Sequence, residues 1–122
     1  MARILIADDE EDIRLLIKIL LVRAGFDVVE AVDGQEAVEK AAEASPDLIL
    51  LDIRMPRMTG LEALDVLRAH PGTARIPVVL VSAYAHDKDT RAVLEEKAVD
   101  YLTKPFLPHD LLGKVQTLLG AS

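Results

Sequence analysis

Polar side chains able to bind metal ions and take part in group transfer directly follow four short apolar runs of this chain. They are a pair of adjacent carboxylates, a third carboxylate, a hydroxyl and an ammonium: Asp8 with Asp9, Asp52, Ser82 and Lys104. If the runs are neighbouring parallel strands, their carboxyl ends bring these groups to one edge of one sheet. Clustered carboxylates repel one another without a cation, and oxygen ligands without histidine or cysteine suit Mg²⁺ or Mn²⁺. The pattern therefore predicts a divalent-metal pocket.

Such a pocket is also suited to phosphoryl chemistry. Mg²⁺ keeps several waters and shares phosphate oxygens readily, which leaves room for a phosphoryl group. A carboxylate at the metal can itself be the nucleophile and form an acyl phosphate. Phosphoryl transfer needs mainly positioning and charge neutralisation. Lys104 would supply a cation, and Ser82 a hydroxyl donor for a phosphoryl oxygen.

Each of these residues, taken singly, has an ordinary structural explanation. Adjacent acids before a helix usually complement the helix dipole, and an aspartate after a strand is most often a turn or cap residue. Ser82 alone would be a loop serine, and Lys104 a solvated lysine. Their joint occurrence after four apolar runs favours the functional interpretation. Glu11 and Asp12 are interpreted as structural.

Two kinds of apolar segment alternate along the chain and would position these residues. Short, continuous runs suit strands covered on both faces, and they lie at 4–7, 28–31, 48–51, 78–81 and 101–103. Segments with helical spacing lie between and after them, at 13–21, 37–42, 61–67 and 111–119, with a thinner one at 87–97. Asp33 could cap the second helix, and Pro108 could be the first residue of the last. This alternation predicts an open parallel sheet with helices on both faces.

Composition excludes several classes of protein. The 122 residues are 51% hydrophobic and 29% charged, which is typical of one globular domain. No apolar stretch approaches the roughly 20 residues of a membrane span. The net charge of −7 argues against direct nucleic-acid binding, which normally needs a basic face. The absence of cysteine excludes disulfides and thiol catalysis, so we expect a cytoplasmic protein.

Four ordered motifs give the chain a resemblance to a known family. They are residues 4–10, 50–60, 81–83 and 100–106. Together they resemble the receiver domain of two-component response regulators, of the single-domain chemotaxis-regulator type, over essentially the whole chain. The resemblance implies a flavodoxin-like, doubly wound (βα)5 sandwich with a five-stranded parallel sheet in the order 2-1-3-4-5. It also implies that residues 1–122 form a single receiver domain.

The resemblance also assigns roles to the predicted pocket. Asp52 resembles the phosphoryl acceptor, and Lys104 the lysine that pairs with the phosphoryl group. Asp8 and Asp9 resemble the acidic pair that holds Mg²⁺. Asp9 would be the more direct metal ligand, alongside Asp52 and the backbone carbonyl of Arg54. The peptide bond between Lys104 and the following proline is expected to be cis.

A second set of implied roles concerns signalling. Ser82 resembles the switch hydroxyl that moves to the phosphoryl group, and Tyr101 the aromatic that then turns inward. The surface that changes would lie around the fourth helix, fifth strand and fifth helix. The helix from Pro108 to Leu119 contains Lys114 but no arginine to pair across a dimer. We therefore expect a monomer or a weak, phosphorylation-dependent dimer.

The implied partner is a sensor histidine kinase or a histidine phosphotransfer protein, which donates a phosphoryl group from phosphohistidine. The receiver would catalyse only its own phosphorylation and dephosphorylation, so it is not expected to be an enzyme acting on a separate substrate. No membrane partner is implied. Two positions that vary in the family and tune hydrolysis are Arg54 and Tyr84 here. Both are large, and we expect them to lengthen the lifetime of the acyl phosphate.

Other classes fit less well. A phosphatase of the haloacid-dehalogenase type needs an aspartate two residues after its nucleophile, where this chain has Arg54. The phosphate-binding motif of nucleotide switches is absent. A flavin binder would need a hydroxyl-rich loop where Asp8 and Asp9 lie. Two alternatives stay open: an interaction module of the receiver fold that signals without phosphorylation, or the receiver fragment of a larger DNA-binding response regulator.

Overall fold

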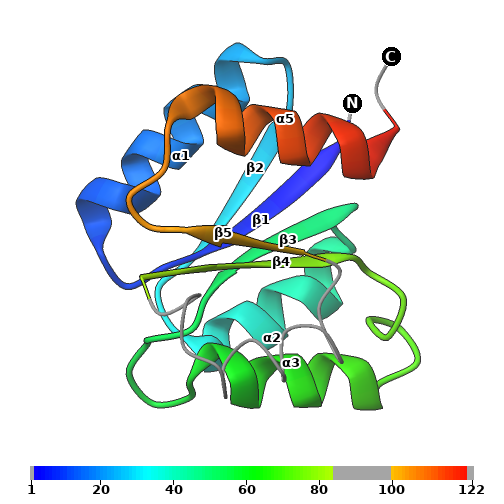
Figure 1. Ribbon diagram of the computed structural model, residues 1–122. Coiled ribbons are helices and arrows are strands. Elements are labelled where there is room, and N and C mark those ends of the chain that lie inside the picture. The colour runs from blue at the N-terminus through cyan, green and yellow to red at the C-terminus, as the bar shows by residue number, and fades with distance from the viewer. Residues whose placement is uncertain (1, 84–99, 121–122) are drawn as a thin grey trace.

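The computed structural model describes residues 2–83 and 100–120, which form a parallel sheet covered on both faces by helices (Figure 1). The strand order is β2-β1-β3-β4-β5, and every pair of neighbours is parallel. The strands are β1 (Arg3–Ala7), β2 (Asp27–Ala31), β3 (Leu48–Asp52), β4 (Val78–Ser82) and β5 (Asp100–Thr103). The predicted flavodoxin-like, doubly wound fold and its strand order are therefore confirmed.

Helices α1 and α5 cover one face of the sheet, and α2 and α3 cover the other (Figure 1). Their bounds are α1 (Glu11–Arg23), α2 (Gly34–Ala44), α3 (Gly60–Ala69) and α5 (Pro108–Leu119). The helix expected at 87–97 lies outside the described residues. Within the ranges 2–83 and 100–120, no helix has both the length and the apolar character needed to cross a membrane.

The core is divided by the sheet into two hydrophobic clusters, because successive strand residues point to opposite faces. Ile49 and Leu51 of β3 belong to the cluster under α2 and α3, whereas Leu48 and Leu50 belong to the cluster under α1 and α5. The same alternation in β1, β4 and β5 decides which face each residue after a strand can reach.

Local capping signals set where the helices begin. The Asp33 carboxylate accepts a hydrogen bond from the Glu36 N–H at 2.8 Å, which caps α2 as predicted. Pro108 is the first residue of α5, also as predicted. Thr59 and Glu62 form a reciprocal capping box at the start of α3. These caps fix the helix ends that border the carboxyl edge of the sheet.

Candidate functional site

Strand alternation places three of the predicted site residues on the same side of the sheet. Asp52 is in register with Val81 of β4, which packs in the cluster under α1 and α5. Asp8 and Lys104 each lie two residues beyond a strand residue of that cluster, Ile6 and Leu102 respectively. All three side chains therefore project to the α1/α5 side of the carboxyl edge. The convergence predicted from the sequence is confirmed.

Lys104 joins the acids that the other strands supply. Its Nζ lies 2.8 Å from Asp8 Oδ2, 3.2 Å from Asp52 Oδ2 and 3.5 Å from Glu10 Oε1. Asp8 and Asp52 are buried, and the Lys104 side chain is only 14% exposed. The contact spans β1, β3 and the end of β5, so Lys104 holds together groups far apart in sequence. The cis peptide bond expected between Lys104 and Pro105 is also present.

The carboxyl group of Asp52 has an unusual protonation equilibrium. Burial and the neighbouring charge of Asp8 raise its pKa from 3.8 to about 6, although Lys104 and the Arg54 N–H oppose this rise. Burial alone would lower the pKa of Lys104, but its hydrogen bond to Asp8 and the charge of Asp52 raise it overall. One ammonium thus compensates only part of the negative charge in the pocket.

The remaining negative charge lies on carboxylates close enough together to hold a metal ion. Oxygen atoms from Asp8, Asp9, Glu10 and Asp52 all lie within 4.8 Å of one another. All four are carboxylates, the hard oxygen donors that Mg²⁺ and Mn²⁺ prefer. Asp9 is exposed beside the two buried aspartates, so it faces the side from which a hydrated ion would enter. The donor set therefore fits a divalent hard cation.

Glu10 is the member that sequence analysis missed. It precedes the first turn of α1, and its side chain is 61% exposed. The signal in the sequence was its position directly after Asp8 and Asp9, but an acid there also fits an ordinary helix start. The contact with Lys104, 94 residues away, and its place among the clustered carboxylates assign it to the pocket.

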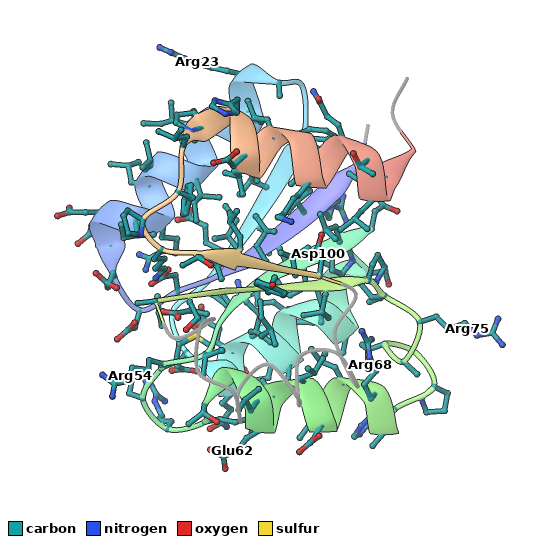
Figure 2. All side chains as sticks on the ribbon, viewed as in Figure 1. Arg23, Arg54, Glu62, Arg68, Arg75 and Asp100 are labelled. Atoms are coloured by element: carbon teal, nitrogen blue, oxygen red, sulfur yellow. The ribbon has the colours of Figure 1, made fainter. Side chains whose placement is uncertain are left out.

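The pocket itself has a volume of about 320 Å³ and opens to solvent beside Asp52. It is lined by the charged residues Asp9, Glu10, Asp52 and Lys104 together with Arg54, Ser82 and Ala83. The Arg54 N–H donates a 3.3 Å hydrogen bond to Asp52 Oδ1, while Lys104 contacts the other oxygen of the same carboxylate. Figure 2 shows the Arg54 side chain at this edge of the molecule, on the opposite side from Arg75. Asp52 is therefore held at both oxygens beside an open pocket.

The two predicted switch residues lie on the other face of the sheet. Ser82 is in register with Thr103, and Tyr101 with Leu80, which packs in the cluster under α2 and α3. Ser82 is buried and lines the pocket, and Tyr101 is half-buried against that cluster. Tyr84, the second residue expected to set the phosphoryl lifetime, lies outside the described residues.

A second ion-paired group contacts the backbone of the loop that carries Asp8 and Asp9. Arg14 Nη1 donates to the backbone carbonyl of Asp8 at 2.9 Å, and its Nε lies 3.1 Å from Glu30. Burial alone would raise the pKa of Glu30, but hydrogen bonds from Lys18 and Arg14 lower it overall. No local pattern in the sequence indicates this group, because Arg14 and Glu30 belong to different elements.

The motifs, the fold and this pocket agree with the match to known proteins. The family model for the response regulator receiver domain matches residues 4–116. The chain belongs to the response regulator receiver family. Receivers are phosphorylated by histidine kinases and bind Mg²⁺ at an acidic pocket, and the four carboxylates described above form an acidic cluster in this chain.

Curated relatives include transcriptional regulators of bacteria. The chain is 39% identical over 120 residues to the alkaline phosphatase synthesis transcriptional regulatory protein PhoP of Bacillus subtilis, covering 98% of this chain and 49% of that protein. It is 41% identical over 119 residues to the DNA-binding dual master transcriptional regulator RpaA of Synechocystis, with the same two coverages. The chain thus spans about half the length of the curated relatives it matches.

Solved structures confirm the fold at the level of the whole chain. The chemotaxis protein CheY4 of Vibrio cholerae superposes with a TM-score of 0.90 at 33% identity, covering 97% of this chain and 98% of that one. The receiver domain of sensor histidine kinase PA1611 from Pseudomonas aeruginosa superposes with a TM-score of 0.91 at 31% identity, covering 98% of both chains. That receiver was solved with a magnesium ion coordinated in its active-site cleft.

Proposed function

We propose that this receiver is the phosphoacceptor of a two-component phosphorelay, and that Asp52 accepts the phosphoryl group from a phosphohistidine. The observation that carries the proposal is the position of Asp52 at the wall of the open pocket, where Lys104 and the Arg54 N–H hold its two oxygens. The donor is a sensor histidine kinase or a histidine phosphotransfer protein. The same site hydrolyses its own phosphoryl group and acts on no separate substrate.

The residues around Asp52 divide the work of transfer. An oxygen of the Asp52 carboxylate forms a bond to phosphorus as the P–N bond to the donor imidazole breaks, and the imidazole leaves with the electron pair. Only the ionised carboxylate is a nucleophile. Because the pKa of Asp52 is raised to about 6, transfer requires a pH above this value, where most of the carboxyl group is ionised. Lys104 offers its ammonium to a phosphoryl oxygen, which neutralises charge as transfer proceeds.

Mg²⁺, with Mn²⁺ as a substitute, is the ion that we assign to the carboxylate cluster. Asp8, Asp9 and Asp52 would hold it, with the backbone carbonyl of Arg54 as a further ligand. The ion supplies positive charge next to the phosphoryl oxygens. This assignment is supported by the carboxylate oxygens within 4.8 Å of one another and by the magnesium ion in the related receiver.

Phosphorylation would be sensed from the opposite face of the sheet. Ser82 lines the pocket and can donate its hydroxyl to a phosphoryl oxygen, and Tyr101 lies on the same face one strand away. Movement of these two side chains would change the surface formed by β5, α5 and the helix predicted from the sequence at 87–97. We assign this surface to the downstream partner, which would distinguish the phosphorylated protein from the resting one.

A second candidate is the receiver of a longer DNA-binding response regulator. It is favoured by one observation, that the chain covers only 49% of each of two DNA-regulating relatives. The chemistry at Asp52 would be the same, but the output would be transmitted to an attached domain. A receiver-fold module that signals without phosphorylation is not supported, because the acceptor, the acids and the lysine are all present.

The test of the proposed function is incubation of the protein with acetyl phosphate and Mg²⁺, followed by intact-mass and peptide mass spectrometry. We expect one added phosphoryl group, located on the peptide that contains Asp52, and no addition when EDTA replaces Mg²⁺. An unmodified protein, a phosphoryl group on another peptide or an equal yield in EDTA would contradict the proposal.

Arg54→Ala is expected to shorten the lifetime of the phosphorylated state. The Arg54 side chain is exposed at the edge of the pocket, where it can cover a phosphoryl anion and hinder the attacking water. Loss of one charge-assisted contact predicts dephosphorylation about five- to tenfold faster. The measurement is the decay of the phosphorylated mass after removal of the donor, with Arg75→Ala as a charge-matched control far from the pocket. A rate that is unchanged or slower would refute this role.

A further inference from the structure

The loop from β3 to α3, residues 53–59, is held from outside by the start of α2. We call this segment the acceptor loop, because it follows Asp52. Within it, Arg57 Nη2 lies 3.1 Å from Asp33 Oδ2. The Asp33 side chain is 3% exposed, and its other oxygen caps α2 by accepting the Glu36 N–H. A buried carboxylate is therefore shared between the acceptor loop and a helix that contributes nothing to the pocket.

The backbone at Arg57 adopts a conformation that suits glycine better. Its φ is +66°, in the left-handed region that residues with a Cβ rarely occupy. The turn around it is tight, since the Met58 N–H donates to the carbonyl of Pro56 at 2.7 Å. This position nevertheless carries a long cationic side chain, and that side chain reaches the buried Asp33 carboxylate.

The rest of the loop is fixed by close backbone packing. A Cβ added at Gly34, the first residue of α2, would overlap the backbone carbonyl of Met58. A Cβ added at Gly60 would overlap the backbone carbonyl of Asp52, and the Gly60 N–H donates a hydrogen bond to the backbone carbonyl of Ile53 at 2.8 Å. The acceptor loop is thus closed at its base by Gly60 and pressed against α2 at Met58. The ion pair to Asp33 adds a charged side-chain contact to this packing.

We propose that Asp33 and Arg57 form a clamp that positions the acceptor loop for metal binding. The loop carries Arg54, whose N–H orients the Asp52 carboxylate and whose carbonyl is the expected further metal ligand. Holding the loop against α2 fixes both groups before the ion arrives, which lowers the cost of ordering them on binding. Asp33 and Arg57 are positioning residues, since neither lines the pocket. The inference rests on the proposed function, because it concerns the affinity of the same site for Mg²⁺.

Charge and positioning predict opposite effects of removing Arg57. Loss of a positive charge close to the pocket would, by itself, favour binding of a cation. Loss of the clamp would instead let the loop move and weaken binding. Because the Arg57 side chain is 69% exposed, its ion pair is expected to be of modest strength. We expect Arg57→Ala to raise the Kd for Mg²⁺ about two- to fivefold.

The experiment is calorimetric titration of the full chain with MgCl₂, without phosphodonor. Arg57→Lys should restore most of the affinity because it keeps the charge. Arg57→Gly should bind as weakly as Arg57→Ala, although it relieves the backbone at this position.

Asp33→Asn removes the ion pair and keeps the helix cap, because asparagine caps as well as aspartate. The double variant Asp33→Asn with Arg57→Ala should bind Mg²⁺ no more weakly than the weaker-binding single variant, because both substitutions remove the same contact. Arg75→Ala is the control for removing a distant charge.

The outcomes separate the clamp from the proposed function. Wild-type protein that binds Mg²⁺, with Arg57→Ala binding as tightly or more tightly, would refute the clamp and leave the phosphoacceptor proposal standing. Arg57→Gly with wild-type affinity would refute it too, because only the backbone would then matter. A lower midpoint of urea unfolding in Arg57→Ala with an unchanged Kd would show a merely structural role. Wild-type protein without affinity for Mg²⁺ would refute both proposals.

Discussion

Asp52→Asn is expected to abolish phosphoryl acceptance from acetyl phosphate in the presence of Mg²⁺. An amide oxygen is a far weaker nucleophile than a carboxylate, and this side chain would keep its place beside the pocket while losing its charge. The phosphorylated mass should therefore be absent at every donor concentration at which wild-type protein is modified. Intact-mass spectrometry over a time course measures the effect directly.

Two controls make this result specific. Asp27→Asn makes the same chemical change at an exposed position at the start of β2, and it should leave the yield of modified protein unchanged. Asp52→Ala should be as inactive as Asp52→Asn, and it excludes recovery of activity by deamidation of asparagine to aspartate. An adduct that persists in Asp52→Ala would mean that another residue accepts the phosphoryl group.

The same substitution is expected to stabilise the metal-free protein at neutral and higher pH. The pKa of Asp52 is raised in the folded state from 3.8 to about 6, so the folded protein binds this proton more tightly than the unfolded chain does. Stability therefore falls as the pH rises through the interval between these values, and the loss is complete above about pH 7. Asparagine carries no charge at any of these pH values. Asp52→Asn should exceed wild type by up to about 3 kcal/mol in free energy of unfolding at about pH 8.

Urea unfolding in EDTA across the range from about pH 4 to pH 8 tests this expectation. The difference between Asp52→Asn and wild type should shrink as the pH falls towards about 4, where Asp52 is protonated in the folded protein. Saturating Mg²⁺ should reduce the difference at high pH, because an ion that binds the folded wild type stabilises it. A wild type as stable as Asp52→Asn in EDTA at high pH would contradict the raised pKa of Asp52.

Much of the site could be predicted because it depends on two regular features of the chain. Short apolar runs define parallel strands, and the residue after each run must then lie at the carboxyl edge. Asp52 and Lys104 follow from this rule alone. Strand alternation, which has a period of two residues, then decides the face on which each side chain lies. Neither step needs the detailed distances between elements.

The contacts that sequence analysis missed depend on those distances. Glu10 reaches Lys104 only because α1 begins where it does, and the sequence favoured an ordinary helix start there equally well. The pair between Arg57 and Asp33 joins a loop to a helix cap across the boundary of two elements. Such pairs have no local pattern, since they are set by how helices pack on the sheet. The predicted role of Tyr84 lies outside the described residues and stays a prediction.

The residues assigned to phosphoryl transfer and those assigned to its detection lie on opposite faces of the sheet. Asp8, Asp52 and Lys104 project towards α1 and α5, whereas Ser82 and Tyr101 follow the alternation towards α2 and α3. On the proposed function, the first set of side chains takes part in phosphoryl transfer and the second set detects it, and the backbone of the sheet lies between the two sets. Substitutions near the side chains that detect phosphorylation need not disturb the residues that take part in the transfer. A sheet of this kind can keep one reaction unchanged while its output is redirected to new partners during evolution.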